Sequence, residues 1–282
     1  MKIETLYHEQ VLNLLPDRDP YGHKGTFGKI LLLCGSKGFT GAAYLAAMGA
    51  LRTGAGLVFL GVPESIYAIE ATKLNEPVVF PLPDEDGKLA VEAASEITRR
   101  LSDMDAVLIG CGLGQSQGTL EAVKTVLEQA RCPVVIDADG INVLVQHKHL
   151  LRGRTAPTIL TPHDGEFLRF GGSLEENRMD SAAKYSREWN CILLLKGHRT
   201  CITDGKRGYL NHTGNPGMAV GGSGDVLAGM IVSLLGQGIP PLEATACAAW
   251  LHGASGDLCA EEIGQYGMLP TDMLIRIPRL MK

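Results

Sequence analysis

The chain has 282 residues, 45% of them hydrophobic and 20% charged, which is enough to bury a large core in one or two domains. The formal net charge is -5 and no block of Lys or Arg occurs, which argues against binding to nucleic acid or to an anionic membrane. The N-terminal stretch lacks an apolar segment and no run of eighteen apolar residues occurs, so we expect a cytoplasmic protein. Seven cysteines without a C-x-x-C pair are expected to be reduced core residues.

Short apolar runs alternate with segments of helical periodicity. The expected strands are residues 29–35, 56–62, 106–112, 133–139, 158–162 and 191–197, followed by a hairpin-like pair at 200–204 and 208–212. The expected helices are 41–52, 89–101, 117–130, 178–189, 223–236, 241–262 and a last one from residue 270. Strands that are apolar throughout belong to a parallel sheet covered on both faces, so the sequence predicts an α/β fold. Without a linker or a repeat, we expect one domain over residues 1–282.

Ligands of such sheets bind at the C-terminal ends of the strands. The unusual segments of this chain follow predicted strands: "GCGLG" (110–114), "DADGIN" (137–142), "TPHDGEF" (161–167) and "KGHRT" (196–200). The common P-loop, Rossmann, zincin, zinc-ribbon and α/β-hydrolase motifs are all absent. A phosphate site must therefore use another device.

The segment "GGSGD" (221–225) offers that device, because it precedes a long apolar helix. Backbone N–H groups at a helix start bind anions, which predicts an anion hole formed by Gly222, Ser223, Gly224 and Asp225. A carboxylate beside such a site can take the proton of an attacking hydroxyl, so Asp225 is the candidate catalytic base. The alternative is a tight turn in which Ser223 or Asp225 only caps the helix.

The other segments each have a functional and a structural interpretation. Lys196, His198 and Arg199 suit nucleotide phosphates, although a basic hairpin turn explains them equally well. In "TPHDGEF", Thr161 or Asp164 can cap the next helix, which does not account for His163.

The two acids of "DADGIN", Asp137 and Asp139, also fit turn chemistry. Near the first strand, Gly41 and Ala42 leave room for a flat ring. The alanines of the following helix, Ala46, Ala47 and Ala50, indicate close packing against the sheet.

Taken in order, these motifs resemble those of the ADP/ATP-dependent NAD(P)H-hydrate dehydratases of the ribokinase-like superfamily. The resemblance extends over residues 8–278 and includes "HKGTFGKILLLCGS", "TGAAYLAAMGALRTGAGLV", "LTPHDGEF", "LKGHRTCITDG" and "GNPGMAVGGSGDVLAG". It implies a ribokinase-like three-layer sandwich with a mainly parallel central sheet. It also implies phosphorylation of the C6 hydroxyl of hydrated NADH or NADPH by ADP, less readily ATP, and elimination of phosphate.

The resemblance also implies residue roles. The hydrated cofactor would contact Ala42, Gly114, His163 and Asp225, and the nucleotide would contact Lys196, Gly197, His198, Arg199, Thr200 and Gly224. Mg²⁺ would be carried by phosphates and water, because no protein metal site is evident. A homo-oligomer, in particular a tetramer, and a separate NAD(P)H-hydrate epimerase are further expectations.

Two other functions stay open on the sequence. A ribokinase-like kinase of a small alcohol, of the hydroxyethylthiazole or pyridoxal kinase type, would share the anion hole and Asp225. A non-catalytic adenine-nucleotide sensor would keep the pocket alone, although an intact "GGSGD" argues against it.

Overall fold

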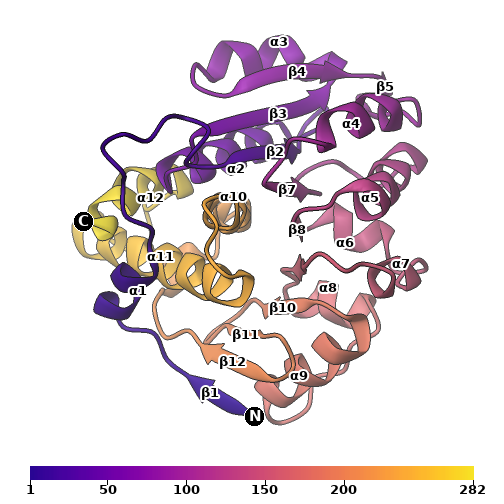
Figure 1. Cartoon of the computed structure of the whole chain (residues 1–282). Helices are drawn as coiled ribbons and strands as arrows, with labels where there is room; N and C mark the ends of the chain where they lie inside the picture. The colour runs from indigo at the N-terminus through magenta and orange to yellow at the C-terminus, as the bar shows by residue number, and fades with distance from the viewer.

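A computed structural model describes all 282 residues and contains a ten-stranded sheet in the order β1-β12-β11-β10-β9-β8-β7-β2-β3-β4 (Figure 1). β11 is antiparallel to both of its neighbours, and all other neighbouring pairs are parallel. The strands are β1 (Lys2–Glu4), β2 (Lys29–Leu33), β3 (Leu57–Pro63), β4 (Val78–Leu82), β7 (Ala106–Ile109), β8 (Val134–Ile136), β9 (Thr158–Leu160), β10 (Ile192–Leu195), β11 (Cys201–Thr203) and β12 (Arg207–Leu210). The predicted parallel sheet with a terminal hairpin is confirmed.

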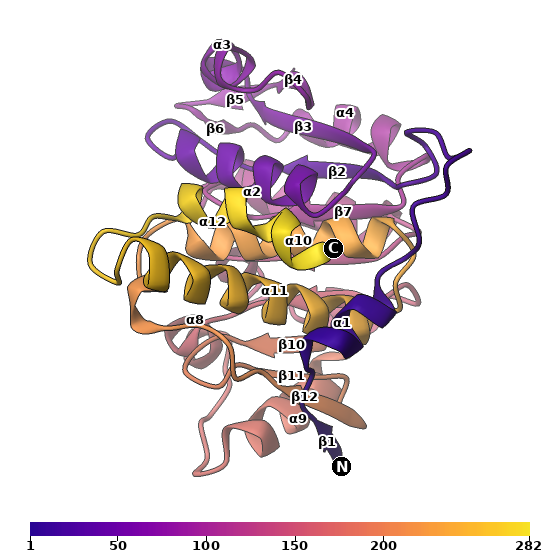
Figure 2. The ribbon, with the colours of Figure 1, turned by 90° about the vertical axis from the view of Figure 1, so that its left-hand side faces the viewer.

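Helices cover both faces of the sheet (Figures 1 and 2). One layer holds α1 (His8–Leu14), α2 (Thr40–Arg52), α10 (Ser223–Gly236), α11 (Pro241–Glu262) and α12 (Pro270–Arg276), and a short 3-10 helix, Ile277–Met281, follows α12. The other holds α4 (Ala93–Leu101), α5 (Gln117–Gln129), α6 (Asp139–Val143), α7 (His149–Arg152), α8 (Asp164–Arg169) and α9 (Arg178–Trp189). α3 (Glu64–Lys73) lies beside β4 at the sheet edge.

The apolar strands are explained by burial on both sides. In β2, Ile30 and Leu32 belong to the core under the α10 layer, whereas Leu31 and Leu33 belong to the core under the α5 layer. Successive side chains of a strand point to opposite faces, so a strand between two helix layers needs apolar residues at every position. The three-layer α/β sandwich follows from this pattern.

α2 and α10 touch through their backbones. A Cβ added at Gly49 would lie 2.6 Å from the carbonyl oxygen of Val226, and one at Gly229 would lie 2.1 Å from that of Ala46. The small residues of α2 therefore allow close contact with α10 as well as with the sheet, and the sequence did not indicate the contact with α10. This contact gives the start of α10 a rigid support.

Several predicted boundaries were wrong. The helix expected at 89–101 begins at Ala93, because a hairpin of β5 (Asp84–Glu85) and β6 (Lys88–Leu89) precedes it. Asp86 and Gly87 form the turn with φ of 51° and 78°, which is the conformation that Asp-Gly favours in tight hairpins. The strand expected at 133–139 ends at Ile136. No helix is long and apolar enough to cross a membrane.

Candidate active site

The first turn of α10 presents free backbone donors. Gly222 is the N-cap with φ of 99°, and no side chain caps the helix, so the capping role considered for Ser223 or Asp225 is wrong. The N–H groups of Gly224 and Asp225 have no acceptor within the protein. Unpaired N–H groups and the helix dipole together favour a bound anion.

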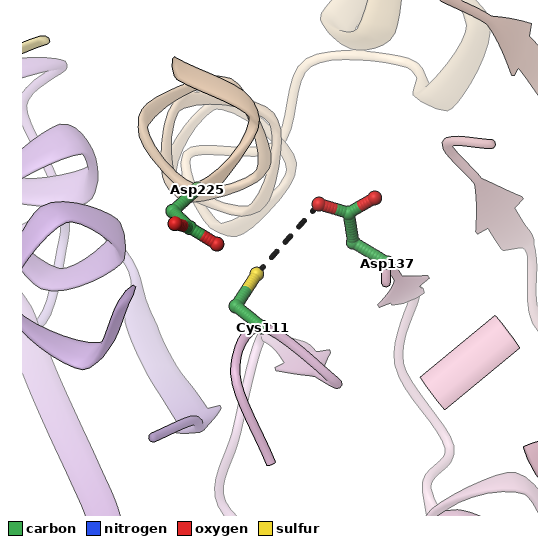
Figure 3. A group of neighbouring side chains, drawn as sticks. All are labelled: Cys111, Asp137 and Asp225. Atoms are coloured by element: carbon green, nitrogen blue, oxygen red, sulfur yellow. Dashed lines mark hydrogen bonds between the residues drawn. The ribbon is translucent and has the colours of Figure 1, made fainter. Parts of the chain in front are cut away.

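The Asp225 side chain lies in a cluster with Cys111 and Asp137, whose ligand atoms are all within 4.8 Å of one another (Figure 3). The three residues come from α10 and from the ends of β7 and β8. Burial, with the charge of Asp137 adding to it, raises the pKa of Asp225 to about 6. A carboxyl with this pKa is mostly ionised at neutral pH and can accept a proton readily.

Lys196 provides the positive charge of this cluster. Its Nζ donates to Asp137 Oδ1 at 2.8 Å and lies 3.8 Å from Glu166 Oε2. Burial alone would lower the pKa of Lys196, but the two carboxylates hold it above the ordinary value. Lys196 therefore stays positively charged at the end of β10, between two acids.

His163, and not Asp164, caps the helix that follows β9. His163 is the N-cap of α8, where its Nδ1 accepts from the N–H groups of Gly165 and Glu166. Asp164 instead forms an ion pair of 2.7 Å with Arg178. The capping expectation for Thr161 or Asp164 is corrected, and His163 still reaches the cavity described next.

A cavity of about 950 Å³ opens in front of α10, a volume within the range of small-molecule sites. It brings together eight residues of the predicted site: His163, Lys196, Gly197, His198, Arg199, Thr200, Ser223 and Gly224. Ala42, Gly114, Gly222 and Asp225 do not line it. The predicted nucleotide residues therefore share one cavity.

The loop of Lys196 to Thr200 is held in a defined shape. Arg199 adopts a φ of 57°, which is uncommon for a residue other than Gly and is typical of functional loops. The hydroxyl of Thr200 donates to the carbonyl of Gly197, and Arg178 Nη2 donates to the carbonyl of Lys196 at 3.0 Å.

Ala42 and Gly114 lie on a different side of the cluster. A Cβ added at Gly112 would lie 2.7 Å from Cβ of Ala42, so the "GCGLG" turn abuts the start of α2. The N–H of Gly114 donates to Asp139 Oδ2 at 2.8 Å, and a Cβ there would meet Lys88 at 2.9 Å. These residues approach the cluster from the β7 side.

Sequence reasoning missed the supports of the cavity. Both carboxylate oxygens of Asp257 hold the loop before α10, through the N–H of Gly214 at 2.8 Å and the side chain of Asn215 at 3.0 Å. Burial lowers the pKa of His252 to about 4, so its neutral ring donates from Nε2 to the carbonyl of Ser223. Both residues lie on α11, and no motif in the sequence of this helix marks their contacts with the loop before α10 and with Ser223.

The Cys111, Asp137 and Asp225 cluster does not fit a resident magnesium ion. Mg²⁺ prefers oxygen ligands, and the ammonium of Lys196 already occupies Asp137. A hydrogen bond to Cys34, together with burial, raises the pKa of Cys111 well above its ordinary value, so its thiol stays protonated.

Fold and site together define a ribokinase-like protein. A ribokinase-like superfamily protein from Enterococcus faecalis superposes with a TM-score of 0.88 at 27% identity, over 99% of this chain and 95% of that one. A hydroxyethylthiazole kinase from Pyrococcus horikoshii, at 17% identity and a TM-score of 0.64, shares the fold.

The family model for NAD(P)H-hydrate dehydratase matches residues 30–279, and the chain belongs to this family. It is 37% identical to the ADP-dependent (S)-NAD(P)H-hydrate dehydratase of Bacillus subtilis, over 100% of this chain and 99% of the relative. The Bacillus subtilis ADP/ATP-dependent enzyme co-crystallised with ATP/Mg²⁺ superposes with a TM-score of 0.87 at 34% identity, over 99% of this chain and 98% of that one. A bifunctional NAD(P)H-hydrate repair enzyme of Moorella thermoacetica is 44% identical over 95% of this chain, which spans only 52% of that relative.

Proposed function

We propose that this chain dehydrates the (6S) hydrates of NADH and NADPH at the expense of ADP, or less readily ATP. One observation supports this most: the half-buried carboxylate of Asp225, with its pKa raised to about 6, belongs to the residue directly after Gly224, whose free N–H lies at the cavity edge. In a chain of this family, that pairing suits transfer of a phosphoryl group to a hydroxyl.

In the proposed reaction, Asp225 accepts the proton of the C6 hydroxyl of the substrate. The hydroxyl oxygen attacks the terminal phosphoryl group of the nucleotide at the same time. An O–P bond forms, the bond to the leaving nucleotide oxygen breaks, and ADP becomes AMP. The N–H groups of Gly224 and Asp225 stabilise the charge on the moving phosphoryl oxygens. In other enzymes, removal of one hydrogen-bond donor to the negative charge of the transition state slows catalysis by about 100- to 1,000-fold.

The second half of the proposed reaction needs little from the protein. Phosphate leaves C6 with the electrons of the C–O bond, helped by the lone pair of the ring nitrogen. A proton then leaves C5, which restores the 5,6 double bond. Phosphorylation makes this step possible because hydroxide is a poor leaving group.

The nucleotide is proposed to occupy the cavity of about 950 Å³, against Lys196, Gly197, His198, Arg199, Thr200 and Gly224. The hydrated cofactor is proposed to contact Asp225, Ala42, Gly114 and His163, the last of which also lines the cavity. We propose that magnesium arrives on the nucleotide phosphates, since the protein offers no suitable set of ligands. A single domain over 1–282, a cytoplasmic location, a homotetramer and cooperation with a separate epimerase stay predictions.

The assay mixes the purified chain with Mg²⁺, hydrated NADH and either ADP or ATP, and follows the absorbance of the reduced nicotinamide. We expect the absorbance to return, with one AMP formed per NADH when ADP is the donor. Asp225→Asn should lose this activity and still bind nucleotide, which a fluorescent analogue would report.

Two outcomes would contradict the proposal. If nucleotide is consumed, a stable phosphate ester of another alcohol accumulates and no reduced nicotinamide appears, the chain is a small-alcohol kinase. Nucleotide binding without any turnover would indicate a sensor.

A further inference from the structure

Asp137 is a buried acid with no role in the proposed chemistry. It is 2% exposed, it lies just after β8, and three groups donate to it. These are the Thr161 hydroxyl at 2.8 Å, the Lys196 ammonium at 2.8 Å and the Cys111 thiol at 3.8 Å. Figure 3 shows the contact of Asp137 with Cys111. A carboxylate with this many donors is fixed in direction and stays in place.

The backbone beside Asp137 is strained. Ala138 has φ of 50° and ψ of -118°, a conformation that residues other than Gly rarely adopt. Its two neighbours serve different segments: Asp137 binds Lys196, and Asp139 accepts from the N–H of Gly114. The strained turn thus directs the acids on either side of Ala138 to different segments, Asp137 to Lys196 and Asp139 to Gly114.

The Asp137–Lys196 ion pair adjoins the free N–H groups of α10. A Cβ added at Gly224 would lie 3.5 Å from Lys196 Nζ and 3.7 Å from Asp137 Oδ2. An anion on the N–H of Gly224 would therefore have the ammonium as a direct neighbour. Lys196 has a flexible side chain and a second carboxylate, Glu166, at 3.8 Å, so its position depends on which acid binds it more closely.

We propose that Asp137 is a positioning residue that holds the Lys196 ammonium beside the start of α10, where it stabilises the phosphoryl group during transfer. This inference rests on the proposed dehydratase activity and assigns Lys196 to the reacting phosphate rather than to general nucleotide binding. Without Asp137, Glu166 draws the ammonium away from Gly224. The transferring phosphoryl group then loses its contact with the ammonium, while the rest of the cavity keeps its contacts with the nucleotide.

The same ion pair governs the ionisation of Asp225. The charged or titratable groups that act on Asp225 are Asp137, Asp139, Cys111 and Lys196. After burial, the Asp137 charge is the main cause of the raised pKa of Asp225, whereas Lys196 lowers it. Loss of Asp137 should lower this pKa, and loss of Lys196 should raise it.

The test measures kcat, the KM for ADP and the pH dependence of kcat for Asp137→Asn, Lys196→Met and the double variant. Both single variants should lose roughly 10- to 100-fold in kcat, the range found for residues that orient catalytic groups, with a smaller change in KM. The acidic limb of the pH profile should move to lower pH in Asp137→Asn and to higher pH in Lys196→Met. At its own pH optimum the double variant should be no slower than Lys196→Met, because Asp137 acts on the phosphoryl group only through Lys196. Asp103→Asn, at an exposed site, is the matched control with wild-type behaviour.

The inference is overturned if Asp137→Asn keeps the wild-type kcat and pH profile. It is also overturned if, in both single variants, the KM for ADP rises as much as kcat falls and the acidic limb moves in the same direction. If Asp137→Asn does not fold, an unchanged acidic limb in Lys196→Met overturns it as well. An inactive wild-type chain would refute the proposed function instead, so the two failures are distinguishable.

Discussion

Asp225→Asn should abolish dehydration and yet stabilise the protein. The ordinary pKa of this carboxyl is 3.8, and in the folded chain it is about 6. Each unit of such a difference corresponds to about 1.4 kcal/mol, so ionised Asp225 costs the folded state up to roughly 3 kcal/mol. Asn has the same shape without the charge, and we expect a gain of about 1–3 kcal/mol at pH 8.

The pH dependence of this gain has a definite sign. Above pH 6 the carboxylate is ionised in both states, and the full cost is present in the folded one. Between pH 6 and 3.8 the folded state takes up the proton first, and the cost falls. Below 3.8 both states are protonated, and the variant has no advantage.

Thermal unfolding of wild type and variant at pH 8 and at pH 4.5 measures this difference. At pH 8 we expect a Tm higher by roughly 3–10 °C, since 1 kcal/mol shifts the Tm of a domain of this size by about 2–4 °C. At pH 4.5 most of the difference should vanish. Asp103→Asn, at an exposed site, controls for the change in net charge. An equal Tm at pH 8, or a gain that persists unchanged at pH 4.5, would refute the account of a half-buried carboxylate whose charge destabilises the folded state.

Three further substitutions test the surroundings of the site. Ala138→Gly should raise the free energy of unfolding by about 1 kcal/mol, because only Gly adopts φ of 50° with ψ of -118° without strain, and a lower Tm would contradict this. Asp257→Asn loses one of two bonds to the loop before α10, so the KM for nucleotide should rise several-fold in steady-state kinetics, whereas an unchanged KM would mean that the loop does not bind nucleotide. Arg199→Ala should raise the KM for nucleotide more than the KM for the hydrate, and equal increases would assign Arg199 to structure alone.

Much of the fold could be predicted because a strand buried on both faces leaves an unmistakable apolar run. Such runs located β2, β3, β7, β8, β9 and β10. β4, "VVFPL", was missed because it contains a Pro and exposed positions, as sheet edges do. The β5–β6 hairpin was missed because its two short strands adjoin a helical pattern, although Asp86 and Gly87 mark a turn.

The site could be predicted in part for a related reason. Strand ends and a glycine-rich helix start are visible in a sequence, and they located the residues that line the cavity, such as Lys196 and Gly224. Contacts between segments are not visible. The pairing of Lys196 with Asp137 depends on the neighbouring positions of β8 and β10 around β9 and on the strained turn at Ala138, neither of which follows from spacing.

Three unfavourable features of the chain occur together at the candidate site, and the packing explains how they persist. A half-buried carboxylate at Asp225, strain at Ala138 and an unpaired N–H group at Gly224 all lie where β7 and β8 end and α10 begins. The strain alone costs on the order of 1–3 kcal/mol. Moving Asp225 and Gly224 out of this arrangement would require the start of α10 to move, and the backbone contact of α10 with α2 at Gly49 and Gly229 opposes that. The close contact of the two helices thus holds a charged, strained and incompletely bonded site in the arrangement that phosphoryl transfer requires.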